Sequence, residues 1–447
     1  MKLNKKKGFT IVELVIVIAI IAILAAVLIP TFASLIRKAN ESADIQACRQ
    51  MNTYLAVNEV TADKSILEVY KTLANGGMSA KDYHPLVSDR YFFWDSKLNR
   101  IVYTDAGYKV LFPEDSTAKQ DNGWYSLTQE IKEADYEMKT NGSDKSVEIT
   151  SAGQLAKLSK DLETNKIQAN DKLTITLKNN IDMMGASFHI DATESCEISL
   201  TADNTVTITG LVNTSYADME LNNVGNETNY HNQVIKISKQ FGNSKVTIKN
   251  ITFKYMSLGN DKSSDVSLVS VPCGVSNSTK NSVTLDNVHI TDSTFMGTYR
   301  VAGFVAHTDA AVTMTNCSIE NSTLTASVGA VAPIFSMLTT QGTFTAVTST
   351  NNTVTCTNTN SKKVDSPLTI EGWTVKLPAD GIMTNESAKS RWYPAKSAFG
   401  IYGATILTGG GTVDKNSQFP LASGGLDCVE TMEEANNYTF NTNRKSQ

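Results

Sequence analysis

The first long apolar run of the chain extends from Phe9 to Ile29 and contains one charged residue, Glu13. About 21 residues of α-helix are roughly 31 Å long, enough to cross the hydrocarbon core of a bilayer. Four lysines precede this run and none lies within it, so we expect a cytoplasmic N-terminal tail and an exported remainder. A plain membrane anchor fits this pattern. A secretory signal peptide fits less well, because its apolar region is shorter and ends at a cleavage site with small residues.

Beyond Pro30, apolar residues recur at every fourth position and predict one amphipathic helix. The apolar stripe consists of Leu35, Ala39, Ala43, Ala47, Met51 and Leu55. Polar and charged residues, among them Asp44, flank this stripe. The small alanines would allow the helix to pack closely against a partner surface.

Shorter elements follow this helix. A capping box at Ser65 and Glu68 begins a predicted second helix, which the pair Gly76-Gly77 ends. Apolar segments at 91–94, 100–103 and 108–112, separated by turn residues, then predict a small antiparallel sheet. We expect this first exported unit to end near the polar stretch 141–144.

The next region has the repeating pattern of a solenoid. A capping box at Ser151 and Gln154 predicts a helix with Leu155, Leu158 and Leu162 on one side. Three similar strand-like segments then begin at Val246, Val283 and Val312, separated by 37 and then 29 residues. Such a period, built from strands, favours a parallel β-solenoid with the preceding helix as its end cap, and a β-sandwich is the alternative.

An asparagine occupies the same offset in each of these segments, at Asn250, Asn287 and Asn316. Asparagine tolerates left-handed backbone torsions, and stacked copies can hydrogen-bond to one another. We therefore expect a bend at this position in each coil, with an asparagine ladder along the stack.

The predicted fold class is α+β, with a mostly-β C-terminal domain. We expect a leader peptide at 1–8, a transmembrane and assembly helix at 9–60 and a small head at 61–142. A β-solenoid at 147–365 and a C-terminal region of unassigned fold at 366–447 would follow.

Glu13 is the feature that a plain anchor does not explain, because a charge at this depth in a bilayer requires a partner. Cleavage after Gly8 would remove the lysines and leave the cationic amine of Phe9 close to Glu13. In a bundle of such helices, Glu13 of one subunit could neutralise the amine of a neighbour and set the register of assembly.

The run from Lys7 to Leu14, Lys-Gly-Phe-Thr-Ile-Val-Glu-Leu, resembles the class III signal of type IV pilins and pseudopilins. This resemblance implies cleavage between Gly8 and Phe9 by a prepilin peptidase and N-methylation of Phe9. It also implies that the helix packs into a filament, with Glu13 in the assembly role and Pro30 at the usual place of a helix-kinking proline. The helix after Pro30 would lie partly in the filament and partly under the head. The segment 149–183 resembles, more loosely, the start of bacterial surface β-helix domains.

Composition narrows the possible functions. Removal of the four leader lysines changes the formal net charge from −5 to −9, and no other lysine–arginine run is present, so nonspecific nucleic-acid binding is not expected. The cysteines stand singly, which argues against a structural zinc site and leaves buried thiols or disulfides open, with thiols favoured: Cys48, Cys196, Cys273, Cys317, Cys356 and Cys428.

Catalysis requires separate consideration, because parallel β-helices include polysaccharide lyases and hydrolases. A lyase would need carboxylates that hold calcium and a basic residue, and the nearest candidates are Asp286, Asp292, Asp309 and Arg300. They form no dense acidic motif, so solvated turns are the favoured interpretation. The histidines lack metal-ligand spacing: His84, His189, His231, His289 and His307. We therefore expect neither an enzyme nor a cofactor or metal site.

These patterns predict a pilin-like structural subunit, minor or located at a filament tip, of a type IV pilus or related pseudopilus. Its expected location is the cell membrane, crossed once, before assembly and a surface filament afterwards. Its expected partners are other pilin subunits, prepilin peptidase and the membrane. Adhesion to glycans or host surface proteins would be the role of the large β domain. The alternative is a membrane-tethered β-helix enzyme acting on carbohydrates, or a glycan-binding protein.

Overall fold

The computed structural model describes most of the chain up to residue 356 and short pieces beyond it. The described ranges are 11–60, 66–78, 85–114, 124–127, 131, 133–213, 233–238, 243–259, 263, 265–271, 281–298, 300–308, 310–327, 331–338, 342–356, 362–363, 401–402, 405–407, 411–413, 417 and 421–423. The predicted leader, Ser65 of the first capping box, Asp309 and most of the region from 366 onward lie outside these residues.

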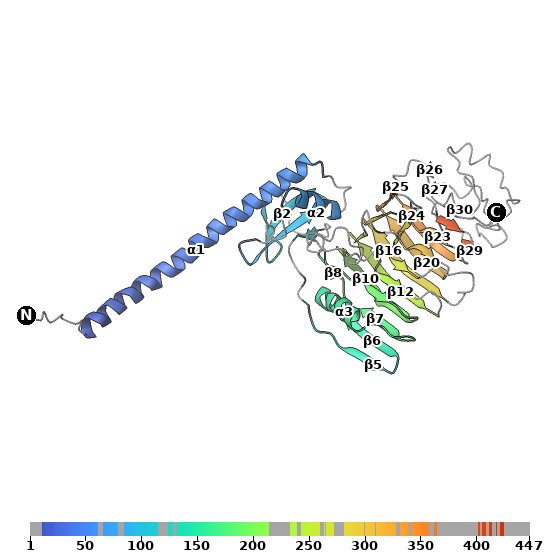
Figure 1. Ribbon diagram of the computed structural model, residues 1–447, viewed down its shortest axis with the longest axis horizontal. Helices are drawn as coiled ribbons and strands as arrows, with labels where there is room; N and C mark the ends of the chain where they lie inside the picture. Colours follow the sequence, from blue (N-terminus) through green and yellow to red (C-terminus); the bar gives the residue numbers. More distant parts are fainter. Residues whose placement is uncertain are drawn as a thin grey trace, which may run out of the picture.

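The N-terminal part consists of a long helix and a small head. Helix α1 (Ile11–Val57) projects as a rod, and its C-terminal end packs on helix α2 (Ile66–Asn75) and an antiparallel sheet (Figure 1). The sheet has the order β3-β2-β1-β4, with β1 (Arg90–Asp95), β2 (Arg100–Asp105), β3 (Val110–Phe112) and β4 (Trp124–Ser126). The predicted short helix and three-stranded meander are confirmed. Strand β4 was not predicted from the sequence. It pairs with β1 rather than with its neighbour in sequence.

The predicted stripe on α1 is correct only over its last turns. Met51 and Leu55 are buried against the head, but Leu35, Ala39 and Ala43 are exposed. Asp44 and Cys48, which are not part of the stripe, are buried in addition. The head covers only the C-terminal part of the helix, so a stripe drawn over the whole exported half overestimates the packed surface.

The C-terminal part is a stack of parallel strands, so the solenoid prediction is confirmed and the β-sandwich alternative is wrong (Figure 1). Its main sheet has the order β29-β24-β20-β16-β12-β10-β7-β6-β5, and β8 also pairs with β10. These strands are β5 (Met138–Asn141), β6 (Asp144–Ile149), β7 (Lys172–Leu177), β8 (Ile181–Asp182), β10 (Glu197–Thr209), β12 (Lys245–Lys254), β16 (Ser282–Thr291), β20 (Ala311–Glu320), β24 (Gly342–Thr350) and β29 (Gly411–Val413).

Further parallel sheets complete the coils. The second sheet contains β9 (Ile190–Ala192), β11 (Ile235–Ile237), β15 (Val269–Ser270), β19 (Val305–Thr308), β23 (Phe335–Leu338), β28 (Thr405–Leu407) and β30 (Leu421–Ser423). The third contains β13 (Ser257–Leu258), β17 (Thr294–Gly297), β21 (Thr323–Ala326) and β25 (Thr353–Cys356). Smaller sheets contain β14 (Asp265–Val266), β18 (Arg300–Ala302) and β22 (Val331–Ala332), and β26 (Lys362–Lys363) with β27 (Ile401–Tyr402).

The three similar sequence segments form three adjacent strands in exact register. Val246 of β12 pairs with Val283 of β16, which pairs with Val312 of β20. Alternate residues of these strands point inward and form one continuous apolar core. The residues that alternate in the sequence therefore point alternately into the solenoid and out of it.

The predicted asparagine ladder is present. Asn250, Asn287 and Asn316 have φ between +51° and +59°. Asn287 Nδ2 donates to Asn250 Oδ1 at 3.1 Å, and Asn316 Nδ2 donates to Asn287 Oδ1 at 2.8 Å. In the next coil, Ala346 takes the corresponding position with φ +52°, so the left-handed bend continues without the amide.

A second bend, which the sequence did not predict, is stabilised by side-chain oxygens inside the corner. The amide of Met256 donates to Ser293 Oγ at 3.0 Å, and the amide of Ser293 donates to Ser322 Oγ at 3.1 Å. In the following coil, the amide of Ser322 donates to Asn352 Oδ1 at 2.9 Å. Each coil thus supplies an acceptor for a backbone donor of the preceding one.

Helix α3 (Ala152–Thr164) closes the first coil as predicted. Ser151 is its N-cap, and the side chain accepts from the amide of Gln154 at 3.4 Å. The Gln154 side chain reaches the amide of Thr150 rather than that of Ser151. Leu155 and Leu158 are buried in the solenoid core, and α3 packs on β9, the first strand of the second sheet.

The turn-prone stretch 141–144 forms the turn of a hairpin. Strands β5 and β6 pair antiparallel on either side of it, and β6 pairs in parallel with β7. The predicted end of the head at 142 and start of the solenoid at 147 therefore fall within one hairpin of the main solenoid sheet. A polar turn gives the same local signal in a hairpin as at a domain boundary.

The head and the solenoid share a packed junction. Strand β4 of the head contacts the solenoid through the amide of Ser126, which donates to the Met184 carbonyl at 2.9 Å. The Tyr125 hydroxyl donates to the Tyr255 carbonyl at 2.9 Å. Val212 and Tyr255 of the solenoid also belong to the apolar core of the head.

Candidate functional site

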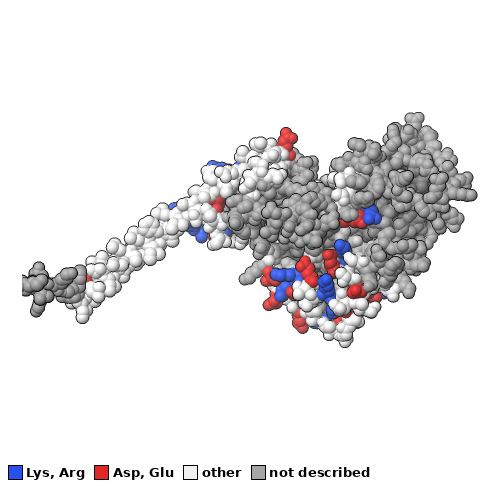
Figure 2. All heavy atoms as spheres, viewed as in Figure 1, with Lys and Arg blue, Asp and Glu red and all other residues white. Residues whose placement is uncertain are grey.

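The N-terminal part of α1 is an apolar surface that no other described part of the chain covers. Its most apolar 18-residue window has a mean hydropathy of 3.3 and is 0% buried. By length and composition it is a candidate membrane span. Figure 2 shows this part of the rod as almost free of charge, with basic and acidic residues appearing only nearer the head.

Glu13 lies in the first turn of α1 and is exposed. It is the one charged residue of the segment 11–36. A carboxylate in the first turn is stabilised by the partial positive charge at a helix N-terminus. Gly8 and Phe9 lie outside the described residues, so the proposed pairing with the Phe9 amine remains a prediction.

Pro30 lies inside α1, and the helix continues through it. Proline has no amide hydrogen, so the Ala26 carbonyl cannot receive the usual bond from four residues later. The roles of Glu13 and Pro30 in assembly remain predictions.

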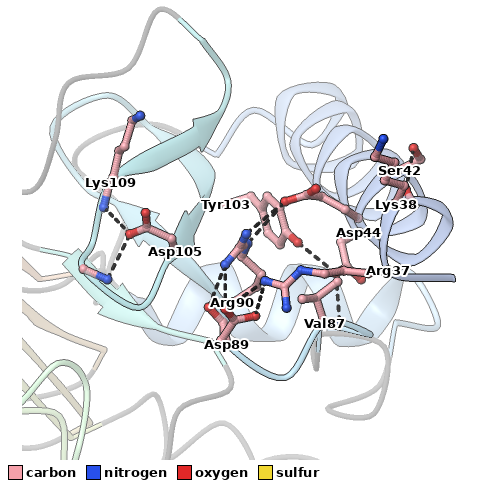
Figure 3. Close-up of polar contacts among 12 residues, drawn as sticks. Arg37, Lys38, Ser42, Asp44, Val87, Asp89, Arg90, Tyr103, Asp105 and Lys109 are labelled. Atoms are coloured by element: carbon pink, nitrogen blue, oxygen red, sulfur yellow. Dashed lines mark hydrogen bonds and ion pairs between the residues drawn. The ribbon is translucent and has the colours of Figure 1, made fainter. Parts of the chain in front are cut away.

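The junction between helix and head is centred on Asp44, whose side chain is only 3% exposed. Its carboxylate accepts hydrogen bonds from the amides of Leu86 at 2.7 Å and Val87 at 3.2 Å, and from the Tyr103 hydroxyl at 3.0 Å (Figure 3). Burial and the Asp44 carboxylate raise the pKa of Tyr103 above its usual range, so its hydroxyl stays protonated and donates.

The next turns of α1 contact strand β2 directly. Asn52 donates to the Ile101 carbonyl at 2.8 Å and accepts from the Ile101 amide at 2.6 Å, which imitates a neighbouring strand. Cys48 donates to the same carbonyl at 3.3 Å, and burial raises the pKa of its thiol to about 12. The helix is therefore attached to the sheet by polar bonds as well as by apolar packing.

Charged residues surround this buried centre. Arg37 Nη2 lies 2.9 Å from both carboxylate oxygens of Asp89, and Arg90 contacts Glu41 at 3.2 Å and Asp89 at 3.0 Å (Figure 3). Arg37 and Asp89 are both about half exposed, so solvent screens their attraction, and the pair orients the helix more than it stabilises it.

Sequence patterning missed Asp44 and Asn52, because a polar residue beside an apolar stripe is normally solvated. One signal could have identified Asp44. It lies four residues before Cys48 and seven before Met51, and this spacing places all three on one face of a helix.

Of the three candidate catalytic residues that the structure describes, two are ion-paired with residues of a neighbouring coil and the third lies at a bend. Asp286 pairs with Lys249 at 2.8 Å, Arg300 pairs with Asp265 at 2.8 Å, and Asp292 lies at the second bend. Among the described residues, no group of three or more His, Cys, Asp or Glu side chains is arranged to hold a metal ion. His289 forms hydrogen bonds with Ser318 and with Asn287 of the ladder. His189 contacts Glu163 at 2.7 Å.

Four cysteines lie in the described part, and all are free thiols: Cys48, Cys196, Cys317 and Cys356. The first three are buried, and burial raises the pKa of each to about 12. A thiol held protonated in this way is a poor nucleophile and redox centre.

Comparison with known proteins gives a match to a family model and a match to a curated relative. Residues 3–29 match the prokaryotic N-terminal methylation motif. The chain is also 32% identical over 89 residues to a fimbrial protein of Moraxella nonliquefaciens. This match covers 20% of the chain and 53% of the relative, so the chain spans about half of that protein's length. No solved structure matches the chain. The chain is thus similar to proteins with the prokaryotic N-terminal methylation motif and to a fimbrial protein, and the motif lies at the start of its projecting apolar helix.

Proposed function

We propose that this chain is a subunit of a type IV pilus or a related pseudopilus, processed after Gly8 and assembled through the apolar part of α1. The observation that carries the proposal is the methylation motif, joined to a helix whose apolar side chains are exposed. Before assembly the helix would cross the membrane once. In the filament, the same surface would pack against helices of other subunits.

The exported part is large, and this favours a minor or tip-located subunit over a bulk one. Every copy in a fibre must fit its head around the shaft, and here each head would carry a whole solenoid. The solenoid would act in adhesion, because stacked coils present long side-chain faces to a ligand. A non-catalytic role is part of this proposal. The tethered-enzyme alternative gains no support from the separate pairing of Asp286 and Arg300.

The first test is the N-terminus of the protein recovered from cells, determined by intact mass and terminal peptide sequencing. We expect a terminus at N-methylated Phe9. An uncut Met1 terminus in cells with an active prepilin peptidase would contradict the proposal.

The second test compares Glu13→Ala with Glu114→Ala, since Glu114 is an exposed carboxylate of the head. We expect Glu13→Ala to lower incorporation into sheared surface filaments at least roughly tenfold, because the neutralising partner of the Phe9 amine is lost. Glu114→Ala should assemble normally. Equal incorporation of the two variants would exclude the assembly role of Glu13.

A further inference from the structure

A polar groove crosses the outside of the main solenoid sheet near its second bend. It has a volume of about 550 Å³ and is lined by residues at or beside the C-terminal ends of β8, β10, β12, β16 and β20. This volume lies within the range of about 300 to 1,000 Å³ that is usual for ligand pockets. The strands are neighbours in the sheet, so the groove runs across the coils over roughly 19 Å at about 4.8 Å per strand.

The side chains that line the groove are suited to hydrogen bonds with the hydroxyl groups of a ligand. Threonines line the groove, among them Thr209 and Thr291, and each is half-buried. Carboxylates of Asp182 and Asp292 accept hydrogen bonds, and the Lys254 ammonium donates them. The hydrophobic member of the lining, Ile181, is buried beneath the surface, so an apolar ligand would find little to contact.

Some of these groups are already held in place. Asp182 Oδ1 accepts from the amide of Met184 at 3.0 Å, and Asn180 Oδ1 accepts from the amide of Thr207 at 2.8 Å. The Lys254 ammonium lies 5.1 Å from the centre of the Tyr255 ring, which is buried at the head junction. Side chains oriented in this way lose less conformational entropy when a ligand binds.

The direction of the groove distinguishes between ligand classes. A peptide that adds to a sheet uses the unpaired backbone of an edge strand. Here the groove crosses strands whose backbone groups are already paired in parallel ladders, as with Thr209, Lys254 and Thr291 in register. A strongly anionic polymer is disfavoured, because two lining carboxylates outweigh one ammonium.

We propose that this groove binds an extended, uncharged oligosaccharide whose hydroxyl groups form hydrogen bonds with the threonine, aspartate and lysine side chains. The proposal names a ligand class for the adhesive role proposed above and rests on that role for its biological meaning. The oligosaccharide lies across the coils, along the axis of the solenoid.

The test uses the full mature chain in detergent micelles and isothermal titration with cellohexaose, maltohexaose and chitohexaose. A hexagalacturonate serves as an anionic probe, and a glycine–serine peptide serves as a peptide probe. We expect at least one neutral hexasaccharide to bind more tightly than both of these. Binding of none of the neutral sugars, or preference for the anionic or peptide probe, would overturn the proposal.

A matched pair of double variants locates the binding. Thr209→Val with Thr291→Val removes two hydroxyls from the groove at nearly constant volume. Thr247→Val with Thr284→Val makes the same change on half-buried outward threonines of the sheet that lie outside the groove. We expect the first pair to weaken binding at least roughly tenfold and the control pair by less than about twofold. Equal loss in both pairs, at matched thermal stability, would place the sugar elsewhere.

Attachment of cells to a surface coated with the bound hexasaccharide separates this proposal from the adhesive role. Loss of attachment with Thr209→Val and Thr291→Val supports both. Normal attachment of cells whose purified variant no longer binds the sugar supports the groove and contradicts the adhesive role.

Discussion

At the scale of single residues, the left-handed bends are the positions where side-chain identity matters most. This conformation costs a residue other than glycine roughly 1 to 2 kcal/mol, and the cost is least for asparagine. Asn250, Asn287 and Asn316 reduce that cost and gain hydrogen bonds from each other. Ala346 has the same torsion without either advantage.

We expect Ala346→Asn to raise the free energy of unfolding by about 1 kcal/mol, because it relieves backbone strain and can extend the ladder from Asn316. Urea unfolding followed by circular dichroism measures the change. Ala311→Asn is the control, since Ala311 is exposed in β20, outside the left-handed positions. If Ala311→Asn stabilised the protein and Ala346→Asn did not, the ladder would not explain the bend.

His289 makes the ladder sensitive to pH. Burial lowers the pKa of His289 below its usual value, although Glu320 opposes this shift. The neutral ring can accept from Ser318 and donate to Asn287, which lie at 2.8 Å and 3.0 Å, whereas an imidazolium could only donate. Because burial disfavours the charged imidazolium, protonation favours the unfolded chain.

We expect the free energy of unfolding to fall as the pH drops below the ordinary histidine pKa of about 6.5, because the unfolded state then binds a proton that the folded state resists. Above that pH the stabilising contribution is fully present. The measurement is urea unfolding from about pH 7.5 to about pH 5.5. His289→Gln should show a smaller fall than the wild type, and an identical pH slope would contradict this account.

At the scale of elements, α1 has two different surfaces along its length. Its apolar N-terminal part is exposed, and its C-terminal part is joined to the head through Asp44, Asn52 and Cys48. A buried carboxylate with three donors can fix the axial position of a helix more sharply than apolar contacts can, because hydrogen bonds are directional.

We expect Asp44→Asn to destabilise the head by about 1 to 3 kcal/mol, because one backbone donor or the Tyr103 hydroxyl loses its acceptor. Hydrogen exchange should accelerate at the amides of Leu86 and Val87. Asp135→Asn is the control, since the side chain of Asp135 is fully exposed. Unchanged exchange at both amides would show that Asp44 does not hold this segment.

At the scale of the whole molecule, the head and solenoid pack through a shared core and backbone bonds. Gly185 lies at this junction with φ +90°, and an added Cβ would approach the Ser126 nitrogen to 3.3 Å. Gly142 has φ +61° in the β5–β6 turn, with no described atom within 4 Å of such a Cβ. The two glycines therefore share a backbone requirement but differ in their contact with the head.

We expect Gly185→Ala and Gly142→Ala each to lose roughly 1 to 2 kcal/mol from the backbone, with an additional loss for Gly185→Ala alone. Hydrogen exchange at the Ser126 amide should accelerate only in Gly185→Ala, because only that side chain displaces β4. Acceleration in both variants would mean that general destabilisation, rather than the junction, is responsible.

Local patterns predicted the elements whose signals are local. The apolar run from Phe9, the short helix ending at Gly76-Gly77, the meander and the cap at Ser151 required no long-range information. The repeats at Val246, Val283 and Val312 predicted a solenoid because a repeated strand implies a repeated position. Strand β4, the place of the β5–β6 hairpin in the solenoid sheet and the second bend were missed, since each depends on partners distant in sequence.

The sequence by itself determined the N-terminal methylation motif, the membrane-length helix and the coil-by-coil stacking with its asparagine ladder. These features follow from composition, spacing and the conformational tolerance of asparagine. The tertiary structure alone decided that Asp44 is a buried junction residue and that the head is continuous with the solenoid. It also brought polar residues from five strands into one groove, because burial and neighbourhood depend on how the elements pack rather than on their order along the chain.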